Sequence, residues 1–274
     1  MSRAITHSRT KQSKSLETKD NDALPNIYHV LLTVHDYFFY VTREYGGKSY
    51  SSPYISNVSL MYALNRSLSA VQRVVSGTAP HYIEDLQRFV LYATPAVPQQ
   101  NLPKIRASIC GANIPWQWNP AVEISFNAVD SPFIFSTEKE SIIGKKLVLP
   151  KWGSYMKYPP LNTFEFFIIG SGTGPRVIRL GKKMVPVVAI YTKCTDIKEK
   201  SGEFNPDHPV NWNDIKMSHT FYDGSIVMQP WIPLIVSARL NGPYYSCNYV
   251  NEFGLKREVK IAKPDPRLYP MVFH

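Results

Sequence analysis

From about residue 105 onward, the chain is a succession of short apolar segments that proline and glycine repeatedly interrupt. The whole sequence holds 22 prolines and 14 glycines. Because proline cannot donate to a sheet hydrogen-bond ladder and glycine weakens a strand interior, these segments predict short strands joined by turns. The predicted strands are residues 122–126, 133–135, 147–149, 164–169, 177–180, 185–191, 226–228, 232–237 and 244–250. The polar residues 195–220 instead predict an irregular insertion.

A strand with two unlike faces is predicted near the start of the ordered chain. In residues 28–35, every second side chain is apolar and should face the core. The alternate positions should form a semi-polar working surface, made of His29, Leu31, Thr33 and His35.

Helical spacing of apolar residues follows this strand. Ser52 as an N-cap and Pro53 at the first helical position predict a helix over residues 53–66, with a broken extension to residue 75. A second short helix is predicted over residues 81–90. The order of one strand, then helices, then many strands predicts an α+β fold with an antiparallel sheet. A ferredoxin-like sheet with extra β-hairpins fits this order and is a common RNA-binding platform.

Most of the net positive charge lies in one segment, residues 145–183. It carries eight basic residues and one acidic residue, a net charge of +7 within a total of +10 for the chain. The same segment holds Trp152, Tyr155 and Tyr158. Basic side chains beside flat rings favour binding of a phosphate-bearing polymer. A solvated basic surface without a partner is the alternative.

A glycine-rich stretch, residues 170–174, lies inside this basic segment. It lacks the spacing of a dinucleotide-binding loop, and residues 181–183 lack the flanking residues of an ATPase phosphate loop. The sequence therefore argues against an ATPase. The backbone amides of the stretch, flanked by Arg176, Arg179 and Lys182, could still hold a phosphate. The alternative is a hairpin turn in an antiparallel sheet.

Neither a metal site nor a cofactor is predicted. The three cysteines are widely spaced and form no CxxC pair, which argues against a zinc site and a disulfide framework. The histidines form no zinc-protease motif. Asp207-His208 and the pair of His219 and Asp223 lack the tight spacing of metal ligands.

Residues 1–24 are predicted to form a flexible basic tail, because they are polar and almost lack large apolar side chains. Residues 25–274 are predicted to form a single domain. The sequence contains no apolar run near the ~20 residues of a membrane-spanning helix, and no apolar core of a signal peptide. A cytoplasmic protein without a membrane partner is therefore expected.

Several motifs resemble those of one known family. The most specific is HDYFFYVTREYG at residues 35–46. The others are SPYISN and LMYAL within residues 52–64, YATPA at residues 92–96, and IRLGKK followed by VPV within residues 178–187. In this order they resemble the Csc-one proteins, the Cas-five-type subunit of type I-D CRISPR interference (Cascade) complexes. The resemblance covers about residues 27–192.

The resemblance implies a ferredoxin-like (RRM-type) antiparallel sheet with an inserted thumb-like β-hairpin, to which we add C-terminal strands. It implies a non-catalytic subunit that caps the 5′ handle of the guide RNA and helps assemble the complex for antiviral DNA targeting. The implied partners are the guide RNA, the Cas-seven-type backbone subunit and the Cas-ten-type large subunit. Target DNA near the adjacent motif is a further contact that the resemblance allows.

Three groups of residues are candidates for RNA contact. The first follows the first strand, the second would belong to the thumb, and the third surrounds the glycine-rich stretch. In chain order they are Arg43, Tyr45 and Lys48; Lys151, Trp152 and Lys157; and Gly172, Gly174, Arg176, Arg179, Lys182 and Lys183.

Two alternative functions remain open at this point. A metal-independent endoribonuclease that processes the guide-RNA precursor would need His35, Tyr37 (or Tyr45) and Lys48 to converge, with His35 as general base or acid. A structural assembly protein would use its basic face only to meet acidic protein partners.

Overall fold

The computed structural model describes residues 24–38, 43–45, 48–50, 52, 54–67, 82–99, 116–117, 154–158, 160–181, 184–229, 232–251 and 254–273. Several predictions lie outside these residues and are not addressed by the structure. They are the tail before residue 24, the helix extension to residue 75, the strands at 122–126, 133–135 and 147–149, and the candidate contacts Lys151, Trp152, Lys182 and Lys183.

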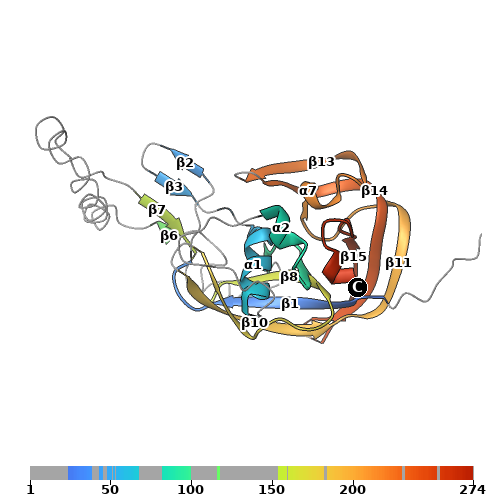
Figure 1. Cartoon of the computed structure of the whole chain (residues 1–274). Helices are drawn as coiled ribbons and strands as arrows, with labels where there is room; N and C mark the ends of the chain where they lie inside the picture. Colours follow the sequence, from blue (N-terminus) through green and yellow to red (C-terminus); the bar gives the residue numbers. More distant parts are fainter. Residues whose placement is uncertain are drawn as a thin grey trace, which may run out of the picture.

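The first sheet is antiparallel and has β1 at its centre (Figure 1). Its strand order is β4-β8-β1-β10-β9, and β5 also pairs with β8. Its strands are β1 (Asn26–Val34), β4 (Leu91–Ala93), β5 (Val97–Pro98), β8 (Thr163–Gly170), β9 (Val177–Leu180) and β10 (Val185–Lys193). Helix α1 (Asn57–Ser67) contacts both β4 and β9, so it crosses one face of this sheet, and the short α2 (Tyr82–Leu86) follows it.

The second sheet is organised by one long strand, β14, which pairs with each of the other four (Figure 1). Its strands are β11 (Thr195–Phe204), β12 (Val210–Asn211), β13 (Thr220–Gln229), β14 (Ile232–Val250) and β15 (Lys256–Ala262). Two single-turn helices, α7 (Trp212–Ile215) and α8 (Pro270–Phe273), accompany it. Side chains from both large sheets belong to one buried core.

A third, smaller sheet joins four short strands from distant parts of the chain in the order β2-β3-β7-β6. They are β2 (Arg43–Tyr45), β3 (Lys48–Tyr50), β6 (Trp116–Gln117) and β7 (Ser154–Lys157). The β3–β7 pair is parallel, and every other strand pair within the described segments is antiparallel. The predicted antiparallel architecture is therefore confirmed, whereas its ferredoxin-like arrangement remains a prediction. No helix in the described part of the chain is long and apolar enough to cross a membrane.

His29 and Leu31 of β1 are buried, so the prediction of a semi-polar working surface was wrong for these two residues, whereas Thr33 is half-buried and His35, beyond the strand, is exposed. His29 is 5% exposed and Leu31 is 8% exposed. The His29 ring stacks on Tyr249 of β14 with ring centroids 4.2 Å apart, and its Nε2 lies 3.3 Å from Oε2 of Glu165. Alternation in a sequence shows that two faces differ in polarity, but it does not show that a second sheet covers the more polar one.

The first helix begins at Asn57 and not at residue 53. Ser52 forms a local turn instead, because its hydroxyl oxygen accepts a hydrogen bond from the Tyr54 amide at 3.2 Å. The same oxygen accepts a second bond from Nε2 of Gln229, at the end of β13, at 3.0 Å. Ser52 therefore binds a nearby backbone amide, as an N-cap would, but it does so in a turn that precedes the helix. Its contact with Gln229 holds this turn in place, so the helix starts later, at Asn57.

Residues 195–220 are not an irregular insertion. They contain the ten-residue strand β11, the short strand β12 and helix α7. Nearly all side chains of β11 are exposed or half-exposed, because it lies at an edge of the second sheet and pairs there with β14. An edge strand that is solvated on both faces needs no apolar alternation, so its sequence carries no strand signal.

A buried carboxylate ties the two large sheets together. Asp214 of α7 is 3% exposed. Its Oδ2 accepts hydrogen bonds from Nδ2 of Asn57 at 2.6 Å and from the Tyr92 hydroxyl at 3.1 Å. Its Oδ1 accepts a bond from the Tyr269 hydroxyl at 2.7 Å. The start of α1, strand β4 and the C-terminal segment are therefore all anchored to one side chain.

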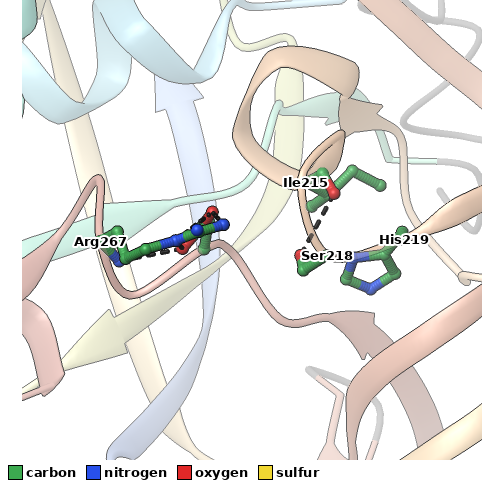
Figure 2. A network of polar contacts seen from close by, with 5 residues as sticks. Ile215, Ser218, His219 and Arg267 are labelled. Atoms are coloured by element: carbon green, nitrogen blue, oxygen red, sulfur yellow. Dashed lines mark hydrogen bonds and ion pairs between the residues drawn. The ribbon is translucent and has the colours of Figure 1, made fainter.

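Two chain segments that follow this carboxylate, residues 215–219 and 265–267, are themselves closed by local polar contacts (Figure 2). After α7, the Ser218 hydroxyl lies 3.1 Å from the Ile215 carbonyl oxygen and 2.9 Å from Nδ1 of His219. Near the C-terminus, the Arg267 guanidinium donates to both carboxylate oxygens of Asp265, with a shortest distance of 2.6 Å. These local bonds fix the turns that present Asp214 and Tyr269 to each other.

Candidate nucleic-acid interface

A groove of about 700 Å³ separates helix α1 from the edge strand β9. One face of α1 supplies Ser59, Tyr62, Ala63 and Arg66, which follow the i, i+3, i+4, i+7 spacing of a helix face. The opposite wall is the strand β9 with the turn that follows it. The remaining lining residues are Phe38, Ile55, Val177, Ile178, Arg179, Leu180, Gly181 and Met184.

Two exposed arginines give this groove its positive charge. Arg66 lies in the last turn of α1, and Arg179 lies on β9. Along β9 the side chains alternate, so Arg179 faces solvent while the neighbouring Ile178 and Leu180 are buried at 3% exposure each. Among the residues that line the groove in the described structure, none is acidic. The groove is therefore suited to a polyanion.

The Arg179 side chain is held over the turn between β9 and β10. Its Nη1 donates a hydrogen bond to the carbonyl oxygen of Met184 at 3.1 Å. The Met184 amide in turn donates to the Gly181 carbonyl oxygen at 3.1 Å, and Gly181 has a φ of 75°, which favours glycine. The remaining nitrogens of the guanidinium stay available to a ligand.

The glycine-rich stretch is not a hairpin turn. It joins β8 to β9, and β1 and β10 lie between these two strands in the sheet. The chain must therefore cross the sheet, and it passes close to α1 on the way. A Cβ on Gly174 would lie 2.7 Å from Cδ2 of Leu64 and 2.7 Å from the Tyr191 hydroxyl, which itself donates to the Pro175 carbonyl at 2.8 Å. Close packing against Leu64 and Tyr191 thus explains why residue 174 is a glycine, independently of any role in phosphate binding.

Gly174→Ala is expected to lower the free energy of unfolding by about 2 kcal/mol, since overpacking a fitted contact typically costs that much. Gly172→Ala is the matched control, because a Cβ there meets nothing within 4 Å. Urea unfolding of both variants and the wild type measures the difference. Equal stability of the two variants would mean that α1 yields to the added methyl group.

The small sheet adjoins the groove at one end. Phe38, which lines the groove, is joined to Tyr158 by two backbone hydrogen bonds of 2.9 and 2.8 Å, and Tyr158 directly follows β7. The candidates Arg43, Tyr45 and Lys48 lie on β2 and β3 of this sheet, with Tyr45 opposite Lys48. Two groups of predicted RNA contacts are thereby connected through the Phe38–Tyr158 bridge.

A family comparison decides the identity of the chain. Residues 25–264 match the family model described as type I-D CRISPR-associated protein Cas5/Csc1. The chain belongs to this family. The Cas5/Csc1 protein is thus a subunit of a CRISPR effector, and the resemblance seen in its motifs is confirmed.

Two solved structures are similar to this Cas5/Csc1 protein at low identity. One is a chain of a type III-B Cmr-β complex bound to cognate target RNA and AMPPnP, with 8% identity, a TM-score of 0.39, and coverage of 77% of this chain and 86% of the other. The other is a CRISPR protein from Archaeoglobus fulgidus, with 9% identity, a TM-score of 0.38, and coverage of 86% and 100%. A comparison with curated proteins found no match.

The predicted contacts are not all placed alike in the Cas5/Csc1 protein. Arg176 and Arg179 are exposed near the groove, and Gly172 is open to added atoms. Lys157, in contrast, is 6% exposed and lies on β7 opposite Trp116. The structure therefore places the Lys157 side chain in the interior, and its predicted contact with RNA stays a prediction.

Arg66 and Tyr62 were missed by sequence reasoning. The signal that could have found them is the helix face that begins at Ser59, because its polar and aromatic members share one side of α1 with Arg66. That signal becomes meaningful only once β9 is known to lie opposite, which the sequence does not reveal.

The residues of the ribonuclease alternative are only partly placed. His35 and Tyr37 follow the end of β1 and are exposed, Tyr37 at 40%. Lys48 lies on β3, and its side chain is outside the described structure. Within the described segments, no group of three or more histidine, cysteine, aspartate or glutamate side chains could hold a metal ion. Convergence of His35, Tyr37 and Lys48 remains a prediction.

Proposed function

We propose that this Cas5/Csc1 protein is a non-catalytic subunit of a type I-D Cascade complex that binds and caps the 5′ handle of the guide RNA. The observation that carries the proposal is the groove between α1 and β9, whose lining includes the exposed residues Arg66 and Arg179 and, among its described residues, no acidic side chain. Through this contact the subunit helps to assemble the complex for antiviral DNA targeting.

The chemistry of the groove suits single-stranded RNA. Proteins that bind single strands combine a positively charged groove with flat or apolar surfaces on which bases stack. The two arginines supply the charge, and Tyr62, Val177 and Met184 supply ring and apolar surface, with Val177 and Met184 exposed at 56% and 45%. Arginine also matches phosphate geometry with two parallel hydrogen bonds.

The proposed partners follow from the family. The guide RNA would occupy the groove and the glycine-rich crossing, and the Cas-seven-type and Cas-ten-type subunits would pack against other surfaces. A ferredoxin-like sheet with a thumb formed near β6 and β7 is part of the same proposal, as is contact with target DNA near the adjacent motif and a cytoplasmic location.

Fluorescence anisotropy of a short labelled RNA with the repeat-derived 5′ handle, compared with a scrambled RNA over a range of salt, tests the proposal. We expect tighter binding of the handle and a salt slope of about −0.7 for each neutralised phosphate. No binding at low salt would overturn the proposal in favour of a purely protein-binding role.

The same samples, kept in chelator and run on a gel, also test the non-catalytic part of the proposal. The RNA should keep its length. RNA that is shortened by the wild type and spared by His35→Ala would instead establish the metal-independent endoribonuclease.

A further inference from the structure

A second cavity lies between the two large sheets and differs in character from the groove. Its volume is about 490 Å³. The first sheet contributes side chains from β5 and β8, and the second contributes β14, β15 and the segment before β12. Its lining residues are Tyr54, Val97, Pro98, Glu165, Phe167, Pro206, Asp207, His208, Pro209, Val236, Tyr249, Arg257, Glu258 and Val259. We call it the inter-sheet pocket.

The inter-sheet pocket is acidic in a chain that is strongly basic. It is lined by three carboxylates and one guanidinium, Arg257, which is already engaged in a hydrogen bond with Tyr249. Each carboxylate has one described hydrogen bond: Glu165 to His29 at 3.3 Å, Asp207 to the Lys260 amide at 2.7 Å, and Glu258 to Ser246 at 2.7 Å. A carboxylate has about four acceptor sites, so most remain open.

A buried histidine on the wall of the pocket adds another acceptor. His208 is 6% exposed, and its Nδ1 lies 2.7 Å from the Pro209 carbonyl oxygen, so Nδ1 must carry the proton that it donates. Burial lowers the pKa of His208 to about 4, which keeps the ring neutral at pH 7. Nε2 is then a bare acceptor, and it has no hydrogen-bond partner among the described residues. Buried acceptors of this kind are rarely left unpaired.

Aromatic rings complete the pocket. Phe167 and Tyr249 pack edge to face with centroids 5.6 Å apart, and Tyr54 lies on the same lining. Rings beside carboxylates are the surroundings that favour an organic cation, through cation–π attraction and charge-assisted hydrogen bonds. The surplus of acceptors means that a suitable ligand must bring several donors and positive charge.

We propose that the inter-sheet pocket receives an arginine or lysine side chain from a neighbouring protein subunit. A phosphate-bearing ligand is disfavoured, since three carboxylates against one engaged arginine would repel it. The pocket is also remote from the RNA groove in the sheet order, because β8 and β5 lie on one side of β1 and β9 lies at the opposite edge. The subunit can thus hold RNA at one edge and a protein at the other. The protein source of the cation rests on the proposed role as a complex subunit.

The test uses the full chain and three probes: a capped Gly-Arg-Gly peptide, the same peptide with neutral citrulline in place of arginine, and spermidine. The readout is the ¹⁵N chemical shift of the His208 ring, because a donor that reaches Nε2 moves this resonance. We expect the arginine peptide to shift the His208 resonance until the pocket is saturated. We also expect it to bind about tenfold more tightly than the citrulline peptide, because citrulline loses one charged hydrogen bond.

The double variant Glu165→Gln/Glu258→Gln should weaken arginine-peptide binding by about tenfold, while Glu203→Gln on β11 should leave it unchanged. Amides of the same shape keep the fold, and the handle-RNA affinity of each sample reports separately on the groove and on the proposed function. If the arginine peptide causes no shift of the His208 resonance, or if the citrulline peptide causes the same shift, the proposal that the pocket binds a cationic side chain is wrong. If spermidine binds more tightly than the arginine peptide, the cation that the pocket receives is a small polyamine and not a side chain of a neighbouring protein.

Discussion

Replacing Arg66 and Arg179 together with alanine is expected to weaken binding of the handle RNA by about a hundredfold near 0.1 M salt. Both arginines are exposed members of the groove lining, which has no acidic residue among those described, so each can form charged hydrogen bonds with a phosphate. Such bonds contribute about 1.5–3 kcal/mol each, and every 1.4 kcal/mol is about tenfold in affinity. The slope of log affinity against log salt should also fall by roughly 0.7 for each lost phosphate contact.

Arg239→Ala is the matched control for this double variant. Arg239 is exposed on β14 of the second sheet, where it pairs with Asp223 at 3.4 Å and lies over the Tyr222 ring. Its removal takes away one positive charge from a different surface, as each single groove variant does from the groove, so the affinity for RNA should change little. If the control weakens binding as much as Arg66→Ala or Arg179→Ala alone, general charge and not the groove attracts the RNA. Each single arginine variant should fall between the control and the double variant.

The second large effect concerns Asp214. Asp214→Ala is expected to lower the free energy of unfolding by about 4 kcal/mol, because four donors that are at most 2% exposed would lose an acceptor. Urea unfolding at pH 7 measures this. The donors are Asn57, Tyr92, Asn211 and Tyr269. Asp223→Ala, at an exposed ion pair, should unfold close to the wild type. A small change at Asp214 would show that water replaces the carboxylate.

Asp214→Asn isolates the pH dependence of the same side chain. Burial raises the pKa of Asp214 from 3.8 to about 6, so between these values the folded state binds a proton that the unfolded state has released. The stability contributed by this group therefore falls as pH rises through that window, by up to about 3 kcal/mol. The difference in unfolding free energy between wild type and variant should follow this fall. His208 acts in the opposite direction, but it is present in both proteins and cancels.

The network around Asp214 also explains how the second sheet bears on function. It fixes the first residue of α1, the helix that carries Arg66 at its other end. A loss of Asp214 should therefore loosen the groove wall as well as the core. The effect of Asp214 on the groove is structural. Measuring RNA affinity at a temperature where the Asp214 variant stays folded separates a loosened groove wall from global unfolding.

Local sequence signals identified the elements that carry their own periodicity. Strand β9 was predicted over residues 177–180, as observed, and β8 and β10 were predicted to within a few residues. In each of these the apolar pattern, alternating in β9 and nearly continuous in β8, is a property of the segment itself. The sequence likewise showed the basic character around Arg176 and Arg179 and the family motifs. Charge and motif spacing can be read from the chain without knowing which segments contact each other.

The elements that were missed depend on neighbours far along the chain. Strand β11 has exposed faces and exists because β14 pairs with it. The helix start moved to Asn57 because Gln229 and Asp214 bind the segment before and at that residue. Burial of His29 depends on Tyr249, and no pattern within β1 could indicate a second sheet.

The sequence by itself determined which segments with their own apolar pattern can be strands, that the chain is basic, and which family motifs it carries, since these follow from side-chain type and spacing alone. Only the tertiary structure decided that Arg66 and Arg179 belong to the lining of one groove, and that three carboxylates line a pocket between sheets. The physical reason is that burial and charge complementarity are set by long-range contacts, which local periodicity does not encode.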